Sequence, residues 1–131
     1  VFAWLIADGD MHLKNLALLK IADPGSEHFD EVRFAPVYDA VTTRIFPGLD
    51  NDQMALTLNG KRDRLTPEDF QALARTIDLP VARAAQLTAD CARRTVDGLQ
   101  ALPVPERIAP GADRIRDRIS DIVRQRAEPF V

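Results

Sequence analysis

The side chains best suited to chemistry lie in one short polar loop, residues 8–15, and at one position further along the chain. The loop combines two carboxylates, an imidazole, an ammonium group and an amide, and Asp39 adds another carboxylate after two short apolar segments. Carboxylate and amide oxygens are ligands that Mg²⁺ prefers, usually together with substrate phosphates. The candidate site residues are Asp10, His12, Lys14, Asn15, Tyr38 and Asp39.

The order of three of these residues matches an arrangement used for phosphoryl transfer. That reaction needs a carboxylate near the attacking hydroxyl, and metal ions held by an Asp and an Asn. Here Asp10 comes first, Asn15 follows in the same loop, and Asp39 comes after a predicted hairpin. The pattern is typical of a kinase catalytic loop followed by a metal-binding aspartate.

Each candidate also has a purely structural interpretation. Asp10 could be a solvated loop acid, and Asn15 could cap a turn. His12 could brace the loop through a backbone hydrogen bond, and Lys14 could pair with phosphate or extend into solvent. Tyr38 could be a packing residue. Taken singly the residues leave both interpretations open, and their combination favours a functional site.

The elements around the loop explain how it could be positioned. Residues 1–7 form an apolar run that predicts the end of a buried helix. Residues 16–21 predict a short buried strand and residues 32–35 a second strand, separated by turn residues. The two strands form a predicted hairpin, which returns Asp39 to the neighbourhood of Asp10.

The rest of the chain is predicted to be mainly helical. Residues 53–58 alternate between apolar and polar types like a strand and end at an Asn-Gly turn. Thr66 followed by proline and two acids predicts the start of a helix, whose apolar residues then recur with helical spacing. Longer helices are predicted over residues 81–102, where two prolines follow, and over residues 112–126. The fold class is mainly α with a small β-hairpin.

The composition indicates one packed domain. The chain has 131 residues, of which 46% are hydrophobic and 28% charged, with a formal net charge of -3 and one cysteine. This balance gives no support to direct nucleic-acid binding, and one cysteine excludes an internal disulfide. No apolar run approaches the ~20 residues of a membrane-spanning helix, so a cytoplasmic location is expected.

Residues 8–19 and 34–39 together resemble the C-terminal kinase domain of the HipA toxins. The resemblance implies the C-terminal lobe of a protein-kinase-like fold over residues 1–131. The catalytic loop and metal-binding hairpin would occupy residues 1–46, and a strand and helical subdomain would occupy residues 47–131.

The same resemblance assigns roles within the loop. Asp10 would be the catalytic base, and Asn15 and Asp39 would bind Mg²⁺. Asp8 and the following glycine depart from the family's usual entry to the loop, so Asp8 adds a carboxylate that either tunes Asp10 or caps the loop. The residues implied to lie at the nucleotide are His12, Lys14, Asn15, Tyr38 and Asp39.

The resemblance implies an ATP-dependent serine/threonine protein kinase that is the toxin of a toxin–antitoxin pair. Its expected partners are a helix-turn-helix antitoxin, nucleic acid only indirectly through that antitoxin, and a protein substrate, with an aminoacyl-tRNA synthetase as the leading target. We expect no membrane partner.

Two features suggest that these residues work as part of a longer chain. The sequence contains no glycine-rich phosphate loop and no recognisable phosphate-binding strand lysine, and it begins with Val1 inside an apolar run. We therefore expect residues 1–131 to be inactive in isolation. The alternatives are a small-molecule phosphotransferase of the aminoglycoside or choline type and a catalytically inert partner-binding domain.

Overall fold

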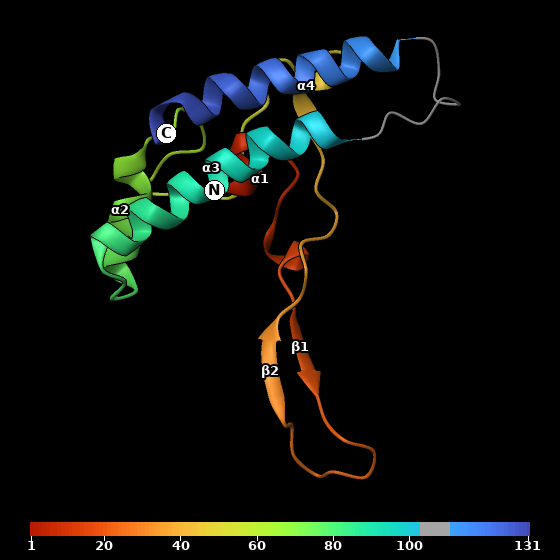
Figure 1. The fold of residues 1–131 in the computed structure, drawn as a ribbon, viewed down its shortest axis with the longest axis vertical. Helices are drawn as coiled ribbons and strands as arrows, with labels where there is room; N and C mark the ends of the chain where they lie inside the picture. Colours follow the sequence, from red (N-terminus) through yellow and green to blue (C-terminus); the bar gives the residue numbers. More distant parts are fainter. Residues whose placement is uncertain (103–110) are drawn as a thin grey trace.

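The computed structural model describes residues 1–102 and 111–131, which form a helical body and a projecting β-hairpin (Figure 1). No described helix is long and apolar enough to cross a membrane. The mainly α fold with a small β-hairpin is as predicted. The helices are α1 (Phe2–Leu5), α2 (Pro67–Thr76), α3 (Val81–Ala101) and α4 (Ala112–Ala127). The strands are β1 (Leu18–Ile21) and β2 (Glu31–Phe34), and short 3₁₀ turns lie at Leu13–Asn15, Thr43–Ile45 and Glu128–Phe130.

The core of the body forms around the first helix. α1 contacts both α3 and α4, and α2 packs on α3. Leu5 is fully buried and Trp4 is 5% exposed, which confirms the buried helix expected near the start of the chain. Burying one such side chain contributes about 1.5–3 kcal/mol. The main cluster contains Trp4, Leu5, Leu65, Phe70, Ala92, Ala127 and Phe130.

The predicted helix boundaries agree with the structure. α2 begins after Thr66, whose backbone N–H donates to a carboxylate oxygen of Asp69 over 2.9 Å, and proline occupies its first position. This interaction satisfies one of the N–H groups that a helix start leaves unpaired. α3 ends at Ala101, one residue before the predicted end. The prolines expected to stop it, Pro103 and Pro105, lie outside the described residues.

The hairpin is antiparallel, with Leu18 opposite Phe34 and Ile21 opposite Glu31. Every residue of β1 and β2 is exposed, so the expectation of a buried strand over residues 16–21 is wrong for these residues. The apolar run correctly predicted a strand. Periodicity measures a tendency to be buried, however, and a two-stranded ribbon without a second layer has nothing to bury its side chains against.

The strand predicted at residues 53–58 does not form. Burial does alternate along this segment, since Met54 and Leu58 are half-buried and the residues between them include exposed ones. Only an isolated bridge joins Leu58 to Lys61, closed by an Asn59-Gly60 turn with positive φ at both positions. The predicted turn is therefore present. The segment remains a loop because the described chain supplies it with no continuous strand partner.

Candidate active site

The base of the hairpin brings together the two predicted metal ligands, Asn15 and Asp39. The ladder continues beyond the strands as the N–H of Ala35 donates to the carbonyl of Ala17 over 2.9 Å. Just past this pair, Nδ2 of Asn15 donates to Oδ2 of Asp39 over 2.7 Å. The pairing of the two strands is therefore what places residues from separate loops in contact.

Local hydrogen bonds hold the Asn15 side chain from its other end. Its Oδ1 accepts the backbone N–H of His12 over 2.8 Å, and its own N–H donates to the carbonyl of His12 over 3.0 Å. Both ends of the amide are therefore engaged within the 3₁₀ turn Leu13–Asn15 and across to Asp39. The amide is therefore held in one orientation, and its Oδ1 keeps one further acceptor position for a ligand.

Asp39 and Tyr38 connect the second loop to the first. Asp39 has a φ of 55°, in the left-handed region that aspartate tolerates better than most residues and that often occurs at functional sites. The hydroxyl of Tyr38 donates to the carbonyl of Lys14 over 2.6 Å. The two loops are thus cross-linked by neighbouring contacts, one through each of these residues.

The loop that carries Asp10 is anchored to the helical body. The N–H of Gly9 donates to Oγ1 of Thr43 over 3.1 Å, and that hydroxyl donates to the carbonyl of Ala7 over 3.0 Å. The N–H of Asp10 donates to Oδ1 of Asp8 over 3.1 Å. The side chain of Asp10 itself is exposed.

Asp8 acts as a buried cap for this loop. It is 2% exposed. Burial raises the pKa of the Asp8 carboxyl above its ordinary value, and the charge of Asp10 adds to that rise. Backbone N–H groups of Asp10, Val41 and Met11 bond to the carboxyl and act in the opposite direction. The sequence left two roles open for Asp8, tuning Asp10 or capping the loop. The bonds that its carboxylate accepts from the loop N–H groups support the capping role.

The remaining predicted residues lie at the surface. His12 and Lys14 are both exposed. The backbone N–H of His12 donates to the Asn15 side chain, the His12 side chain takes part in a capping box with the Asn15 backbone, and the Lys14 carbonyl accepts the Tyr38 hydroxyl. The roles of their imidazole and ammonium groups remain predictions.

Two hollows that share no lining residue lie beside the loop. A cavity of about 340 Å³ is lined by Asn15, Tyr38 and Asp39 together with Asp8 and mostly apolar residues of the hairpin base, the 54–58 loop and the helical body. Its volume falls within the ordinary range for small-molecule sites. Asp10 instead lines a second hollow, of about 490 Å³.

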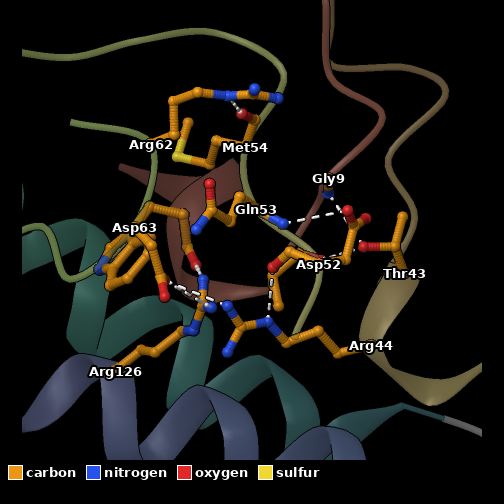
Figure 2. A network of polar contacts seen from close by, with 11 residues as sticks. Gly9, Thr43, Arg44, Asp52, Gln53, Met54, Arg62, Asp63 and Arg126 are labelled. Atoms are coloured by element: carbon orange, nitrogen blue, oxygen red, sulfur yellow. Dashed lines mark hydrogen bonds and ion pairs between the residues drawn. The ribbon is translucent and has the colours of Figure 1, made fainter. Parts of the chain in front are cut away.

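A polar network behind the loop was not predicted (Figure 2). Arg44 donates to the carbonyl of Asp52 over 2.8 Å and to the Asp63 carboxylate over 3.1 Å. Arg126 reaches the same carboxylate at 3.5 Å and donates to the carbonyl of Trp4 over 2.7 Å. Burial and the charge of Arg44 lower the pKa of Arg126 to about 10, with Asp63 opposing, so it stays protonated at neutral pH. No local motif could reveal contacts between residues so distant in sequence.

The donor set at Asn15 and Asp39 suits a hard cation bound together with a phosphate. Both side chains offer oxygen atoms, and the two residues are in direct contact beside a cavity. Among the residues that the structure describes, no group of three or more His, Cys, Asp or Glu side chains is arranged to hold a metal ion. Mg²⁺ commonly takes one or two protein carboxylates and completes its coordination with substrate phosphates and water.

Comparisons with known proteins agree with this architecture. The family described as HipA-like C-terminal domain matches residues 1–99. A solved structure of HipA from Shewanella oneidensis MR-1, in complex with HipB and operator DNA, superposes with a TM-score of 0.69 at 18% sequence identity. The match covers 97% of this chain and 30% of that one, so the chain spans under a third of that HipA's length. No match to a curated protein was found. The chain belongs to the HipA-like C-terminal domain family.

Proposed function

We propose that these residues form the catalytic part of a HipA-type kinase that transfers the γ-phosphoryl group of ATP to a serine or threonine of a protein. The observation that carries the proposal is the 2.7 Å contact between Asn15 and Asp39 at the base of the hairpin. Asp10 lies in the same loop as Asn15, in the order that phosphoryl transfer by kinases uses. On this proposal the helical body and hairpin are the C-terminal lobe of a protein-kinase-like fold.

Asp10 would act as the base. The oxygen of the substrate hydroxyl attacks the γ-phosphorus and forms the new P–O bond, while its proton passes to the Asp10 carboxylate. The bond between the γ-phosphorus and the oxygen that bridges it to the β-phosphorus breaks, and ADP leaves with that electron pair. The exposure of Asp10 allows a hydroxyl to approach within hydrogen-bond reach.

Asn15 and Asp39 would hold Mg²⁺, which when bound neutralises charge on the β- and γ-phosphates. Tyr38 and the backbone of His12 keep these two side chains in place through the bonds described above. The 340 Å³ cavity beside them is the proposed location of part of the nucleotide. His12 and Lys14 are proposed to approach the phosphates from the exposed side of the loop.

The partners of the full-length protein are also proposals. The similar HipA structure contains HipB and operator DNA, which supports an antitoxin partner for this protein. We propose that this antitoxin is a helix-turn-helix protein and that nucleic acid is reached only through it. The family resemblance supports an aminoacyl-tRNA synthetase as the protein substrate. The glycine-rich phosphate loop and its lysine would come from the rest of the full-length protein.

The direct test is phosphotransfer by the full-length protein with Asp10→Asn. Loss of a general base typically slows a reaction by about 10²–10⁴-fold, so we expect that loss with an unchanged unfolding temperature. The matched control is Asp23→Asn, which neutralises an exposed aspartate at the far end of the hairpin and should leave the rate unchanged. Activity of Asp10→Asn close to that of wild type would refute the assignment.

A further inference from the structure

Asp10 lines a hollow that contains neither of the proposed metal ligands. This hollow has a volume of about 490 Å³ and lies between the catalytic loop and the segment that follows the hairpin. If Asp10 is the base, as proposed above, the hydroxyl that gives up its proton can reach it from this hollow. Its lining residues are Gly9, Asp10, Val41, Thr43, Phe46, Leu49 and Asp52.

The walls of the hollow combine apolar surface with negative charge. Phe46 is 47% exposed and Leu49 is 41% exposed, although both are large hydrophobic residues. Asp52 adds a second carboxylate to the lining of the hollow, and it forms no ion pair within the described parts of the chain. The nearby cation, Arg44, instead donates to the main-chain carbonyl of Asp52 and to Asp63.

The side wall is built before any substrate arrives. The N–H groups of Phe46, Leu49 and Asp52 donate in succession to the carbonyls of Thr43, Phe46 and Leu49 over 3.0–3.1 Å. Figure 2 shows Asp52 lying between Gly9 and the side chain of Arg44. A preformed wall lowers the entropy cost of binding a flexible segment.

Glycine at position 9 permits the close approach of Asp52 to the loop. A Cβ at Gly9 would lie 1.9 Å from Oδ2 of Asp52 and 2.8 Å from Oγ1 of Thr43. The absence of a side chain therefore lets a second carboxylate sit directly beside the residue that precedes Asp10.

We propose that this hollow receives the acceptor segment of the protein substrate and selects for its sequence. The serine or threonine hydroxyl lies at Asp10, an apolar neighbour packs on Phe46 and Leu49, and an arginine or lysine neighbour pairs with Asp52. The volume admits a few residues of an extended segment rather than a folded surface. This inference rests on the proposed kinase function and adds the chemical class of its acceptor.

The test uses the full-length protein and a library of serine and threonine peptides that carry arginine, glutamine or glutamate at each neighbouring position. Wild type should prefer arginine, and Asp52→Asn should reduce the arginine-to-glutamine ratio of kcat/KM by about three- to tenfold. In wild type the N–H of Gln53 donates to Oδ1 of Asp52 over 3.0 Å. The amide oxygen of the asparagine in Asp52→Asn can accept the same bond. The substitution therefore removes charge and little else.

Two further variants complete the experiment. Asp50→Asn is the matched control, because Asp50 pairs with Arg118 and does not line the hollow. It should leave the peptide preference as in wild type. Phe46→Ala should lower kcat/KM for peptides with a large apolar neighbour by about tenfold and change little for peptides without one.

The outcomes separate this inference from the proposed function. Phosphotransfer that depends on Asp10 but shows the same peptide preference in wild type, Asp50→Asn and Asp52→Asn overturns the acceptor hollow alone. Asp10-dependent turnover that occurs only on small-molecule acceptors also overturns it. Absence of Asp10-dependent phosphotransfer to any acceptor overturns the kinase function and this inference together.

Discussion

The helical body and the hairpin are stabilised in different ways although they form one continuous chain. The body buries Trp4 and Leu5 among three other helices, whereas every residue of β1 and β2 is exposed. The hairpin relies on its backbone ladder and on contacts at its base. The proposed catalytic residues lie where these two regions meet. The body anchors the loops, and the hairpin brings Asn15 and Asp39 into contact.

The largest expected difference between the regions is in core stability. Leu5→Ala should lower the free energy of unfolding by about 2–5 kcal/mol, because it empties a site that is fully buried. Leu18→Ala, the matched change on the exposed hairpin, should cost less than about 1 kcal/mol. Chemical denaturation of residues 1–131 measures both. Equal losses would show that the hairpin has a packed core of its own.

A second difference concerns a buried carboxylate of the body. Burial alone would raise the pKa of Asp69, but hydrogen bonds from Asn59, Lys61 and Thr66 and the charge of Lys61 outweigh it and lower the pKa to about 2. Asp69→Asn should lower the free energy of unfolding by about 1.5–3 kcal/mol at neutral pH, the usual range for hydrogen bonds to a charged group.

The same carboxylate predicts a pH dependence. Because the folded-state pKa lies below the ordinary value of 3.8, the stabilisation is complete above about pH 4 and is lost as the pH falls towards 2. Asp69→Asn should flatten the decline of the unfolding free energy across that interval. A variant whose curve runs parallel to that of wild type would show that Asp69 is not the group responsible.

Where the loop of residues 8–15 meets the helical body, Gly9→Ala should lower the free energy of unfolding by about 1–3 kcal/mol, because the added Cβ would overlap Asp52 and crowd Thr43. Adding Asp52→Ala removes the closer overlapping atoms, so the double variant should be more stable than the sum of the single effects by about 1 kcal/mol. Strict additivity in equilibrium unfolding would mean that the crowding arises elsewhere.

The sequence was most informative where structure depends on near neighbours. The cap at Thr66 and the turn at Asn59 were predicted because their signals lie within a few residues. Burial of the hairpin was predicted wrongly, because it depends on a second layer that local apolar character cannot report.

The same distinction between local signals and distant contacts applies to the candidate site. The order of Asp10, Asn15 and Asp39 suggested a shared site, and the structure brings the last two into contact. The network from Arg126 to Trp4 and the hollow that Phe46 and Asp10 both line were not predicted. Both bring together residues distant in sequence, and no local spacing encodes such contacts.

Titration of Mg-ATP into the full-length protein tests the central claim, that Asn15 and Asp39 hold the metal while Asp10 serves as base. Asp39→Asn is the sharpest variant, since asparagine tolerates the same left-handed backbone but carries no charge. We predict that it weakens Mg-ATP affinity by about tenfold or more, whereas Asp10→Asn stays within about twofold of wild type. Equal affinity for all three proteins would contradict the account.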